Sequence, residues 1–590
     1  MKAIKFKISM ALTPLNENLG HYRAAHLLRR TVFGANQSTI DAFASLTPTQ
    51  ALAQLFKDGL ELPLPPIDPN TGTEWMSTGT TDANSENFEL ENYFIRWHLG
   101  QFFGGLSAEQ DKLAYIFREK LVLFFHTHFT TKRSVVNNSR ALYFQNQLFR
   151  KFAFDGFLPD GLNFKSLTVK ISVDNAMLVF LDGRLNVKGS PNENYARELL
   201  ELYSAGRGLE GANDNTGTEG DYGTFTEQDV QAGAKVLSGF DVDNDFSTID
   251  PDTELPSGKI KGNGTIASQH DNLPKQLSNR LGSIVIEPNA ELLINGEPTR
   301  ESAIDEITQF IDAIYGQEET AKHICRKIYR FFGYHEIDEA RQNGIITDLA
   351  QIFTDSNFSI QAVLEAFFSS LEFYEGNSGI EDDAYGSIIK SPIDLVVGHA
   401  RKFEIELPDF LQNADEFYEI TGFMMNKISD MGLNYYEPYE VAGYPAYHQF
   451  PIYYRGWITT SYLTQRYAYI QSVSSGMMDN NPITVMSPIE YVEKNIDFDL
   501  AANARDLVEE VCKHFLAVSA NIAFDNTTSE LSEERLNYFL NAFLLSFDID
   551  EDPESTWTFR WTNGVDRETV SRQLQDLFNA VLQSPEYQLM

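Results

Sequence analysis

Apolar residues recur at helical spacing along almost the whole chain, and this periodicity is the strongest constraint on its fold. A helix from His21 to Gly34 has one apolar stripe and ends at the glycine. Thr47-Pro48-Thr-Gln50 then begins another helix, with threonine as N-cap, proline in the first turn and glutamine as the third helical residue. We therefore predict an all-α fold, a large multi-lobed helical body with long loops and one small β-hairpin.

The length of 590 residues exceeds what one ordinary core needs, so we expect several lobes. We predict an N-terminal extension at 1–20, a helical core at 21–480 and a C-terminal helical segment at 481–590 packed on the core. Stretches rich in Pro, Gly, Ser, Asn and Thr predict loop insertions at 60–85, 207–225 and 241–298. Within the last, two β-rich runs around Pro288-Asn289 at 283–296 predict the hairpin.

The chain is strongly acidic, with 46 Lys and Arg against 84 Asp and Glu and a net charge of −38. Such a surface repels phosphates, so we expect no nucleic-acid partner.

Two cysteines, Cys325 and Cys512, exclude a disulfide-rich scaffold and a Cys-rich zinc module. No apolar run approaches the roughly eighteen residues needed to span a bilayer, and we predict no transmembrane segment. The N-terminal apolar run is too short for a clear signal peptide, which leaves localisation open.

Several sequence blocks together resemble the bacterial family catalogued as domain of unknown function 1800. In chain order the blocks are His26–Gly34, Phe125-His-Thr-His-Phe129, Asn192–Leu202, Thr226–Val230, His270-Asp271 with Lys275, Cys325–Phe332, Lys390-Ser-Pro392, Val441–Pro445 before Trp457, and Ser584–Gln588. Each block is weak alone, but their order along nearly the whole chain is specific.

The resemblance implies a large, mostly helical bacterial protein, frequently exported and encoded beside a second uncharacterised family that looks like sulfatases and alkaline phosphatases. A sulfatase-like protein partner is thus expected, with the chain exported or associated with the cell envelope. Two positions depart from the family pattern: Tyr203 stands where the family often has histidine, and Tyr444 where it often has tryptophan. The first departure removes one potential metal ligand.

The densest polar motif is Asn192–Leu202. On a regular helix Glu193, Arg197 and Glu201 share one stripe, with Glu198 on a neighbouring one. This pattern suits an intrahelical salt-bridge ladder. It also suits a catalytic role for Glu198, Glu201 and Arg197, in which one glutamate is a general base or metal ligand.

Histidines supply the other candidate ligands. His126 and His128 point about 200° apart on a continuing helix, so both cannot bind one ion there. His128 shares the face of Leu121 and Phe124 and is expected to be a packed core residue, which makes His126 the better candidate for a polar contact or ligand. His270-Asp271 lies in a predicted loop, where the pair could serve as an oriented base or as metal ligands, or Asp271 could merely cap a turn before Pro274. We hypothesise that His126, His270, Glu198 and Glu201 meet in one pocket, where they could hold zinc or manganese.

Asp241, Asp243 and Asp245 follow the alternating carboxylate spacing of a calcium loop. Phe246 replaces the glycine of an EF-hand, and Asp252 stands where its final glutamate would be. The segment is therefore either a looser calcium loop or a solvated acidic loop.

Two functional hypotheses follow. The first is a cell-envelope accessory or assembly protein that acts with a sulfatase-like partner. The second is a metal-dependent enzyme with a His/Glu/Asp site that acts on an exported or cell-surface substrate. The sequence has no Walker loop, Gly-x-Ser-x-Gly elbow or His-Glu-x-x-His motif, so it gives no support to the chemistries that depend on them.

Overall fold

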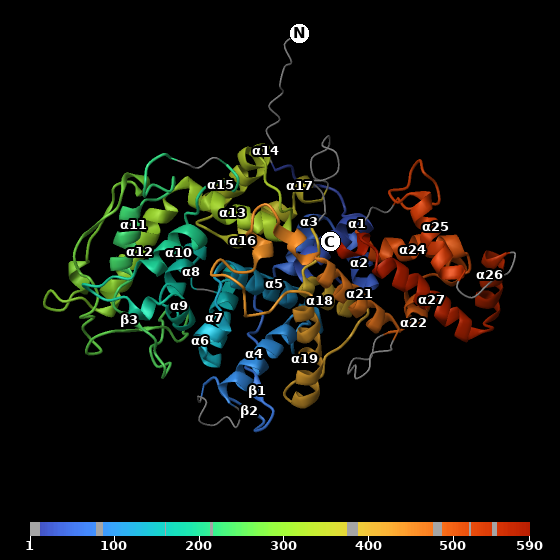
Figure 1. Ribbon diagram of the computed structural model, residues 1–590, viewed down its shortest axis with the longest axis horizontal. Coiled ribbons are helices and arrows are strands. Elements are labelled where there is room, and N and C mark those ends of the chain that lie inside the picture. The colour runs from blue at the N-terminus through green and yellow to red at the C-terminus, as the bar shows by residue number, and fades with distance from the viewer. Residues whose placement is uncertain are drawn as a thin grey trace, which may run out of the picture.

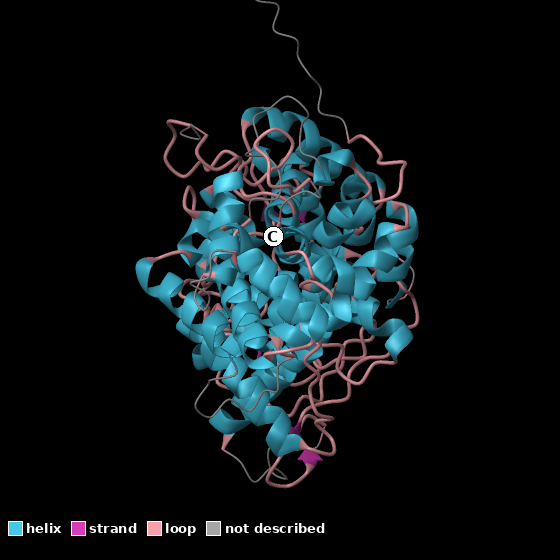
Figure 2. Cartoon of the chain, turned by 90° about the vertical axis from the view of Figure 1, so that its right-hand side faces the viewer, coloured by secondary structure: helices cyan, strands magenta, loops and turns pink. Residues whose placement is uncertain are grey.

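Helices form nearly all of the regular structure, so the predicted all-α fold class is confirmed (Figure 1). The structure is a computed structural model that describes residues 12–77, 86–157, 159, 161–212, 216–374, 388–475, 486–517, 521–545 and 552–590. Figure 2 shows that helices dominate and that the strands are short. None of the helices in these ranges has both the length and the apolar character needed to cross a membrane.

The first half of the chain forms the helices α1 (Gly20–Val32), α2 (Gln37–Ala44), α3 (Pro48–Leu55), α4 (Asn87–Gln101), α5 (Lys112–His128), α6 (Arg133–Val136), α7 (Ser139–Lys151), α8 (Phe164–Ile171), α9 (Asn175–Phe180), α10 (Glu193–Glu198), α11 (Glu227–Val236) and α12 (Arg300–Tyr315). The second half forms α13 (Glu318–Phe332), α14 (Glu339–Arg341), α15 (Thr347–Asp355), α16 (Ile360–Phe368), α17 (Leu371–Tyr374), α18 (Pro392–Lys402), α19 (Ala414–Asp430), α20 (Pro445–His448), α21 (Thr460–Ser475), α22 (Pro488–Asn495), α23 (Phe498–Ala501), α24 (Ala504–Phe515), α25 (Glu533–Leu544), α26 (Pro553–Asn563) and α27 (Arg567–Leu582). Two short π-helices, η5 (Leu199–Tyr203) and η8 (Gln342–Ile346), continue α10 and α14.

The body is elongated, with α8–α12 and their loops at one end and α22–α27 at the other (Figure 1). Helices α4–α7 and α13–α19 lie between these ends.

Local capping explains several helix starts. Thr47 and Gln50 form a capping box at α3, and Ser391 with Asp394 forms another at α18.

An ionic network lies inside the central core. Glu119 of α5 pairs with the neighbouring Arg118 at 3.2 Å and with Arg150 of α7 at 2.6 Å, and all three side chains are 0% exposed. Burial by itself lowers the pKa of Arg150, but the contact with Glu119 more than compensates and leaves that pKa raised. The network joins α5 to α7 through charge as well as through apolar packing.

The β-structure among the described residues consists of three two-stranded antiparallel sheets. They pair β1 (Ile67–Asp68) with β2 (Thr73–Glu74), β3 (Phe240–Asp241) with β4 (Lys259–Ile260), and β5 (Lys275–Gln276) with β6 (Val285–Ile286). The β5–β6 hairpin spans 275–286, inside the predicted 241–298 loop, so one small hairpin does form there, but the pairing predicted around Pro288-Asn289 is wrong. Val285–Ile286 pairs with the segment before it, and Ala290–Leu292 forms a 3-10 turn. A β-rich run does not specify its partner, because pairing depends on tertiary approach.

The C-terminal residues extend along the start of α18. Lys390 donates its backbone N–H to Gln588 O at 2.8 Å, and Met590 donates to Ile388 O at 2.9 Å. Helix α27 packs against α21, α22 and α25.

The predicted border at 480/481 and parts of the predicted loops, 78–85 and 213–215, lie outside the described residues, and the domain boundaries stay a prediction.

Candidate functional site

The motif from Asn192 to Leu202 does not form one regular helix. Helix α10 ends at Glu198, and the π-helix η5 continues to Tyr203. The predicted pair of Glu193 and Arg197 forms inside α10, at 3.5 Å. A π-turn holds one residue more than an α-turn, so the four-residue spacing is lost between Arg197 and Glu201. Arg197 pairs with Glu227 of α11 at 2.8 Å, whereas Glu201 pairs with Arg207 at 2.6 Å. Short π-helices are frequent at functional sites, which directs attention to the end of η5.

Side chains from two other helices bind the last carbonyl groups of η5. Leu202 O accepts hydrogen bonds from His323 Nε2 at 3.2 Å and from Lys327 Nζ at 2.7 Å, both on α13. Tyr203 O accepts a hydrogen bond from His128 Nε2, at the end of α5, at 3.1 Å. These bonds satisfy carbonyl groups that a helix end leaves without an intrahelical partner.

Gly206 allows this close approach. Its φ is +68°, a backbone conformation that L side chains rarely adopt, and a Cβ there would lie 2.3 Å from Nδ1 of His323. Any larger residue would therefore push the imidazole away from the Leu202 carbonyl group. The absence of a side chain at Gly206 therefore makes room for the buried ring of His323.

A small cavity of about 20 Å³ adjoins this helix end. Its lining includes His128, Lys327, Arg330, Phe331, Tyr447 and His448, which come from α5, α13 and α20. The guanidinium of Arg330 is already paired with the Glu210 carboxylate at 2.7 and 2.5 Å. His128 Nδ1 and His448 Nε2 are buried and have no hydrogen-bond partner. The cavity, together with the end of η5, is called here the Lys327 pocket.

The Lys327 pocket favours neutral side chains. Burial lowers the pKa of Lys327 to about 8, against the opposing effect of Glu210. Burial first and Lys327 second lower the pKa of His448 to about 4. Burial also holds the pKa of His128 well below its usual range, so both imidazoles are neutral at physiological pH. Since His128 Nε2–H faces a carbonyl group, its Nδ1 presents a lone pair.

His126 lies apart from this pocket, among tyrosines. Its Nε2 is 3.2 Å from Tyr444 Oη, and its ring packs on Tyr436 with centroids 4.2 Å apart. Burial lowers the pKa of His126 to about 3. The departure at Tyr444 thus places a hydroxyl group beside the first histidine of Phe125–Phe129.

His270 and Lys275 share a carboxylate that lies on α12. His270 Nε2 is 3.3 Å from Glu306 Oε1, and its Nδ1 is 2.9 Å from Ser238 O. The ammonium of Lys275 pairs with the other oxygen of Glu306. Asp271 accepts a hydrogen bond from Leu273 N at 3.1 Å, as a turn-forming aspartate does. The structure joins these residues to Glu306 and not to Glu198 or Glu201.

The acidic loop has a different arrangement at each carboxylate. Asp243 is buried and accepts hydrogen bonds from the backbone N–H groups of Ser247 at 2.8 Å and Thr248 at 2.7 Å. Asp241 accepts a hydrogen bond from Val242 N at 2.9 Å, and Asp245 is exposed. Asp243 therefore organises its own loop, a role that the alternating spacing did not reveal.

The structure does not bring His126, His270, Glu198 and Glu201 into one group. In the part of the chain that is described, no three His, Cys, Asp or Glu side chains are arranged to hold a metal ion. Three of these residues have separate partners: Glu201 pairs with Arg207, His126 lies beside Tyr444, and His270 lies beside Glu306.

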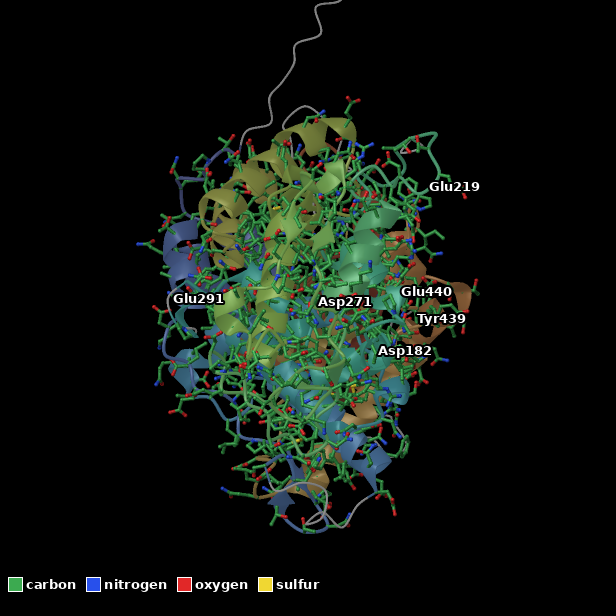
Figure 3. The ribbon with its side chains drawn as sticks, turned by 90° about the vertical axis from the view of Figure 1, so that its left-hand side faces the viewer. Asp182, Glu219, Asp271, Glu291, Tyr439 and Glu440 are labelled. Carbon is green, nitrogen blue, oxygen red and sulfur yellow. The ribbon has the colours of Figure 1, made fainter. Side chains whose placement is uncertain are left out.

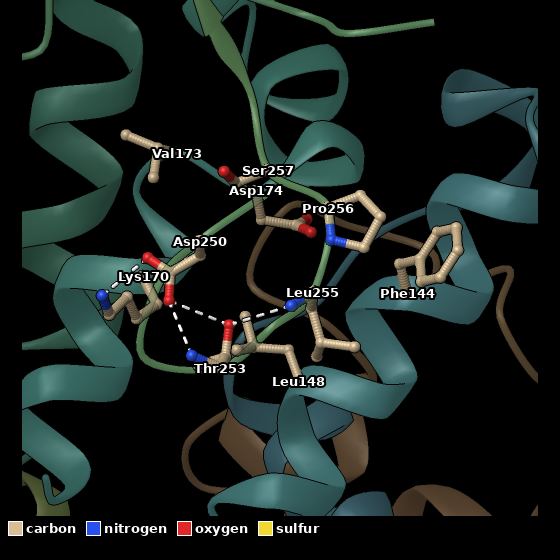
Figure 4. Close-up of a pocket in the computed structure, with 10 residues that line it drawn as sticks. All are labelled: Phe144, Leu148, Lys170, Val173, Asp174, Asp250, Thr253, Leu255, Pro256 and Ser257. Atoms are coloured by element: carbon tan, nitrogen blue, oxygen red, sulfur yellow. Dashed lines mark hydrogen bonds and ion pairs between the residues drawn. The ribbon is translucent and has the colours of Figure 1, made fainter. Parts of the chain in front are cut away.

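A second small cavity, of about 10 Å³, lies beside α8 and α9 (Figure 4). Lys170 pairs there with Asp250 at 2.6 Å. Asp174 caps α9 by accepting from Met177 N at 2.9 Å, and it also accepts from Gln145 Nε2 at 2.8 Å. Burial outweighs these hydrogen bonds and raises the pKa of Asp174 to about 7.

Asp174→Asn should stabilise the protein in alkaline solution. Asparagine keeps the cap but carries no charge. The pKa of Asp174 is higher in the folded state than in the unfolded state. The contribution of this residue to the free energy of unfolding is therefore fully present below pH ~4 and is lost as pH rises through about 7. At pH 8 we expect the variant to gain about 1–3 kcal/mol in free energy of unfolding, and almost nothing at pH 4. Urea unfolding at both pH values measures this, with Asp252→Asn as the control, and a gain independent of pH would contradict it.

The fold and the site define a large helical protein with a buried polar pocket at a π-helix. The family described as "Protein of unknown function (DUF1800)" matches residues 26–589, and the chain belongs to this family. No curated protein and no solved structure matches the chain.

Sequence reasoning missed the residues that complete the Lys327 pocket. His323 and Lys327 lie on a stripe of α13 that periodicity marks only as buried, and His448 follows Val441–Pro445 by three residues. The signal was present in Cys325–Phe332, where Lys327 and Arg330 interrupt an apolar run. A basic residue on a buried helix face needs a partner, so a buried acceptor opposite Lys327 could have been expected, but the sequence does not say which one.

Proposed function

We propose that this chain is an accessory or assembly protein of the bacterial cell envelope that binds a sulfatase-like partner. The resemblance to the family supplies the partner and the location, and the surface charge supplies the physical support. A protein with net charge −38 attracts a basic face on another protein and speeds the encounter with it.

Exposed carboxylates are the observation that carries the proposal. Asp182, Glu219, Glu291 and Glu440 all lie exposed, and the labelled residues in Figure 3 include them together with Tyr439. Tyr439 is 84% exposed, and tyrosine is among the residues enriched in protein interfaces. A tyrosine beside carboxylates offers a partner both apolar area and charge.

Reversing charge at Glu219 and Glu291 should slow association with a purified sulfatase-like protein from the same bacterium. We expect the association rate at low salt to fall about tenfold, because steering depends on the summed charge. Biolayer interferometry at two salt concentrations measures this rate. The control is Glu534→Lys, an exposed acid on α25 at the opposite end of the body.

Either of two results would count against this proposal. One is an association rate that changes equally in the control and the double variant. The other is the absence of any complex, both with the purified partner and in a pull-down from native cells.

The alternative is a metal-dependent enzyme that acts on an exported or cell-surface substrate. Its support is the pair Glu198 and Glu201, since burial and then the charge of Glu201 raise the pKa of Glu198. A zinc or manganese ion would relieve this repulsion. Elemental analysis after metal-replete preparation, with calcium included for the Asp241–Asp245 loop, discriminates the two proposals. A stoichiometric ion that is lost in Glu198→Gln would favour the enzyme.

A further inference from the structure

The amine of Lys327 has a carbonyl group, not a carboxylate, as its hydrogen-bond partner, as does the buried amine of Lys390. Lys327 Nζ donates to Leu202 O at 2.7 Å, and no salt bridge to Lys327 occurs among the described residues. The adjacent cations on α13 differ, since Arg326 pairs with Glu319 at 2.6 Å and Arg330 pairs with Glu210 at 2.5 Å. A carbonyl group accepts a hydrogen bond from a neutral amine as well as from an ammonium ion, and the amine then keeps its lone pair.

The surroundings of this amine favour its neutral form. Every titratable or charged group that influences Lys327, or that Lys327 influences, can be named: Glu210, Arg326, Arg330, His128, His323 and His448. The three imidazoles are kept neutral by burial, and the two guanidinium groups oppose a further positive charge. Only Glu210 favours the ammonium form, and it is already engaged by Arg330.

The cavity also places proton acceptors beside the amine. His128 Nδ1 and His448 Nε2 are both buried without a hydrogen-bond partner, although both rings line the same cavity as Lys327. His128 is 2% exposed, so its free nitrogen is not satisfied by bulk water. His448 Nε2 also lies 4.0 Å from the Glu440 carboxylate. Two unprotonated nitrogens in rings that line the cavity disfavour an anion there and suit a reaction in which a proton leaves nitrogen.

We propose that Lys327 is a nucleophile that forms a reversible imine with a small aldehyde or ketone in this pocket. Lys327, Tyr447 and His448 are each partly exposed, so the cavity can be reached from solvent. The cavity of about 20 Å³ accommodates little more than a carbonyl group, which limits the reacting end to a short, unbranched compound. This activity is independent of partner binding and adds to it.

The chemical step balances without a further reactant. The lone pair of Nζ adds to the carbonyl carbon, and the carbonyl oxygen takes a proton from water. The positively charged nitrogen returns a proton to the hydroxide formed, through the free imidazole nitrogen of His448 or His128, which gives the carbinolamine. The carbinolamine hydroxyl group then takes a second proton from water and departs as water, and the hydroxide left behind removes the remaining N–H proton, which gives the neutral imine. Hydrolysis of the imine by the same route returns the free amine.

Reductive trapping tests the proposal on the intact protein. Acetaldehyde and sodium cyanoborohydride at pH 7.5 convert any imine into a stable ethylamine, which peptide mass spectrometry locates. At this pH an amine with a pKa of about 8 has a neutral fraction about 200-fold larger than a lysine of ordinary pKa. We expect Lys327 to be ethylated at least about tenfold faster than Lys322, which lies on the same helix and pairs with Glu318.

The ethylation rates of Lys327 and Lys322 are compared within the wild-type protein, so this test does not require any variant to fold. Ethylation of Lys327 at or below the rate of Lys322 would overturn the proposal, as would a Lys327 rate that rises only above pH 9. Variants add a second readout: Lys327→Arg should abolish the fast-labelled site, whereas Lys322→Arg should leave it intact. His448→Gln should slow trapping severalfold at unchanged acetaldehyde concentration, and an unchanged rate in both His448→Gln and His128→Gln would overturn the role of the imidazoles.

Discussion

Glu119→Ala should lower the free energy of unfolding by about 5 kcal/mol, at the upper end of the range for breaking a buried ion pair. The carboxylate is the common partner of Arg118 and Arg150, and none of the three side chains is exposed. Removing it leaves two guanidinium groups in the core, and neither can lose its proton at accessible pH. His98, 3.8 Å from the same carboxylate, is kept neutral by burial and cannot take over its role.

Guanidinium-chloride unfolding followed by circular dichroism measures this loss. The matched control is Lys151→Ala at the last residue of α7, where we expect a change within about 0.5 kcal/mol. Glu119→Gln separates charge from shape, because it keeps the hydrogen-bond acceptor and the volume. A loss of less than about 1 kcal/mol in Glu119→Ala would show that water or rearrangement compensates the arginines.

Glu306→Ala should cost about 3–5 kcal/mol at pH 7, because it leaves the ammonium of Lys275 buried without its carboxylate. Burial already lowers the pKa of Lys275, and Glu306 is the main group that opposes this effect. A lysine whose pKa is lower in the folded than in the unfolded protein destabilises the fold while it is protonated. This cost in free energy declines as pH rises from the pKa in the folded protein toward the pKa in the unfolded protein. The variant should therefore recover part of its loss between pH 7 and pH ~10.

Thermal and urea unfolding at several pH values measure this recovery. Glu301→Ala, at an exposed position in the first turn of the same helix, is the control and should cost no more than about 1 kcal/mol. A loss that does not change with pH would place the damage in packing and not in the charge of Lys275. His270→Ala gives a further comparison, because it removes the second partner of Glu306 while the ion pair remains.

Much of the fold was predictable because helix starts and stops are local. Thr47 with Gln50 and Ser391 with Pro392 specify their caps from residues within one turn. The π-turn at Leu199–Tyr203 was not predictable, because the residues before it and within it have the apolar spacing of an ordinary helix. The partner of Val285–Ile286 was missed for a related reason, since short strands acquire their register from tertiary contacts.

The sequence predicted residues of the candidate site better than it predicted their interaction partners. The sequence singled out His128, His270 and Lys275, but their partners lie far along the chain. His128 binds a carbonyl group at Tyr203, and Glu306 binds both other residues. Periodicity shows which face of a helix is buried and does not show what lies opposite. A backbone carbonyl, moreover, has no signature in a sequence.

The π-helix has a consequence for how chain length can vary in this protein. One residue more than an α-helix needs is contained in Leu199–Tyr203, so a single deletion there would let the segment relax into regular helix. The residues on one side of the deletion would then turn by about 100° relative to those on the other. The Leu202 and Tyr203 carbonyl groups would face away from α13 and α5, although every side chain of the pocket would still be present. In an alignment of related sequences, a chain with a one-residue deletion at Leu199–Tyr203 would thus lack the pocket, even if all of the pocket's side chains are present.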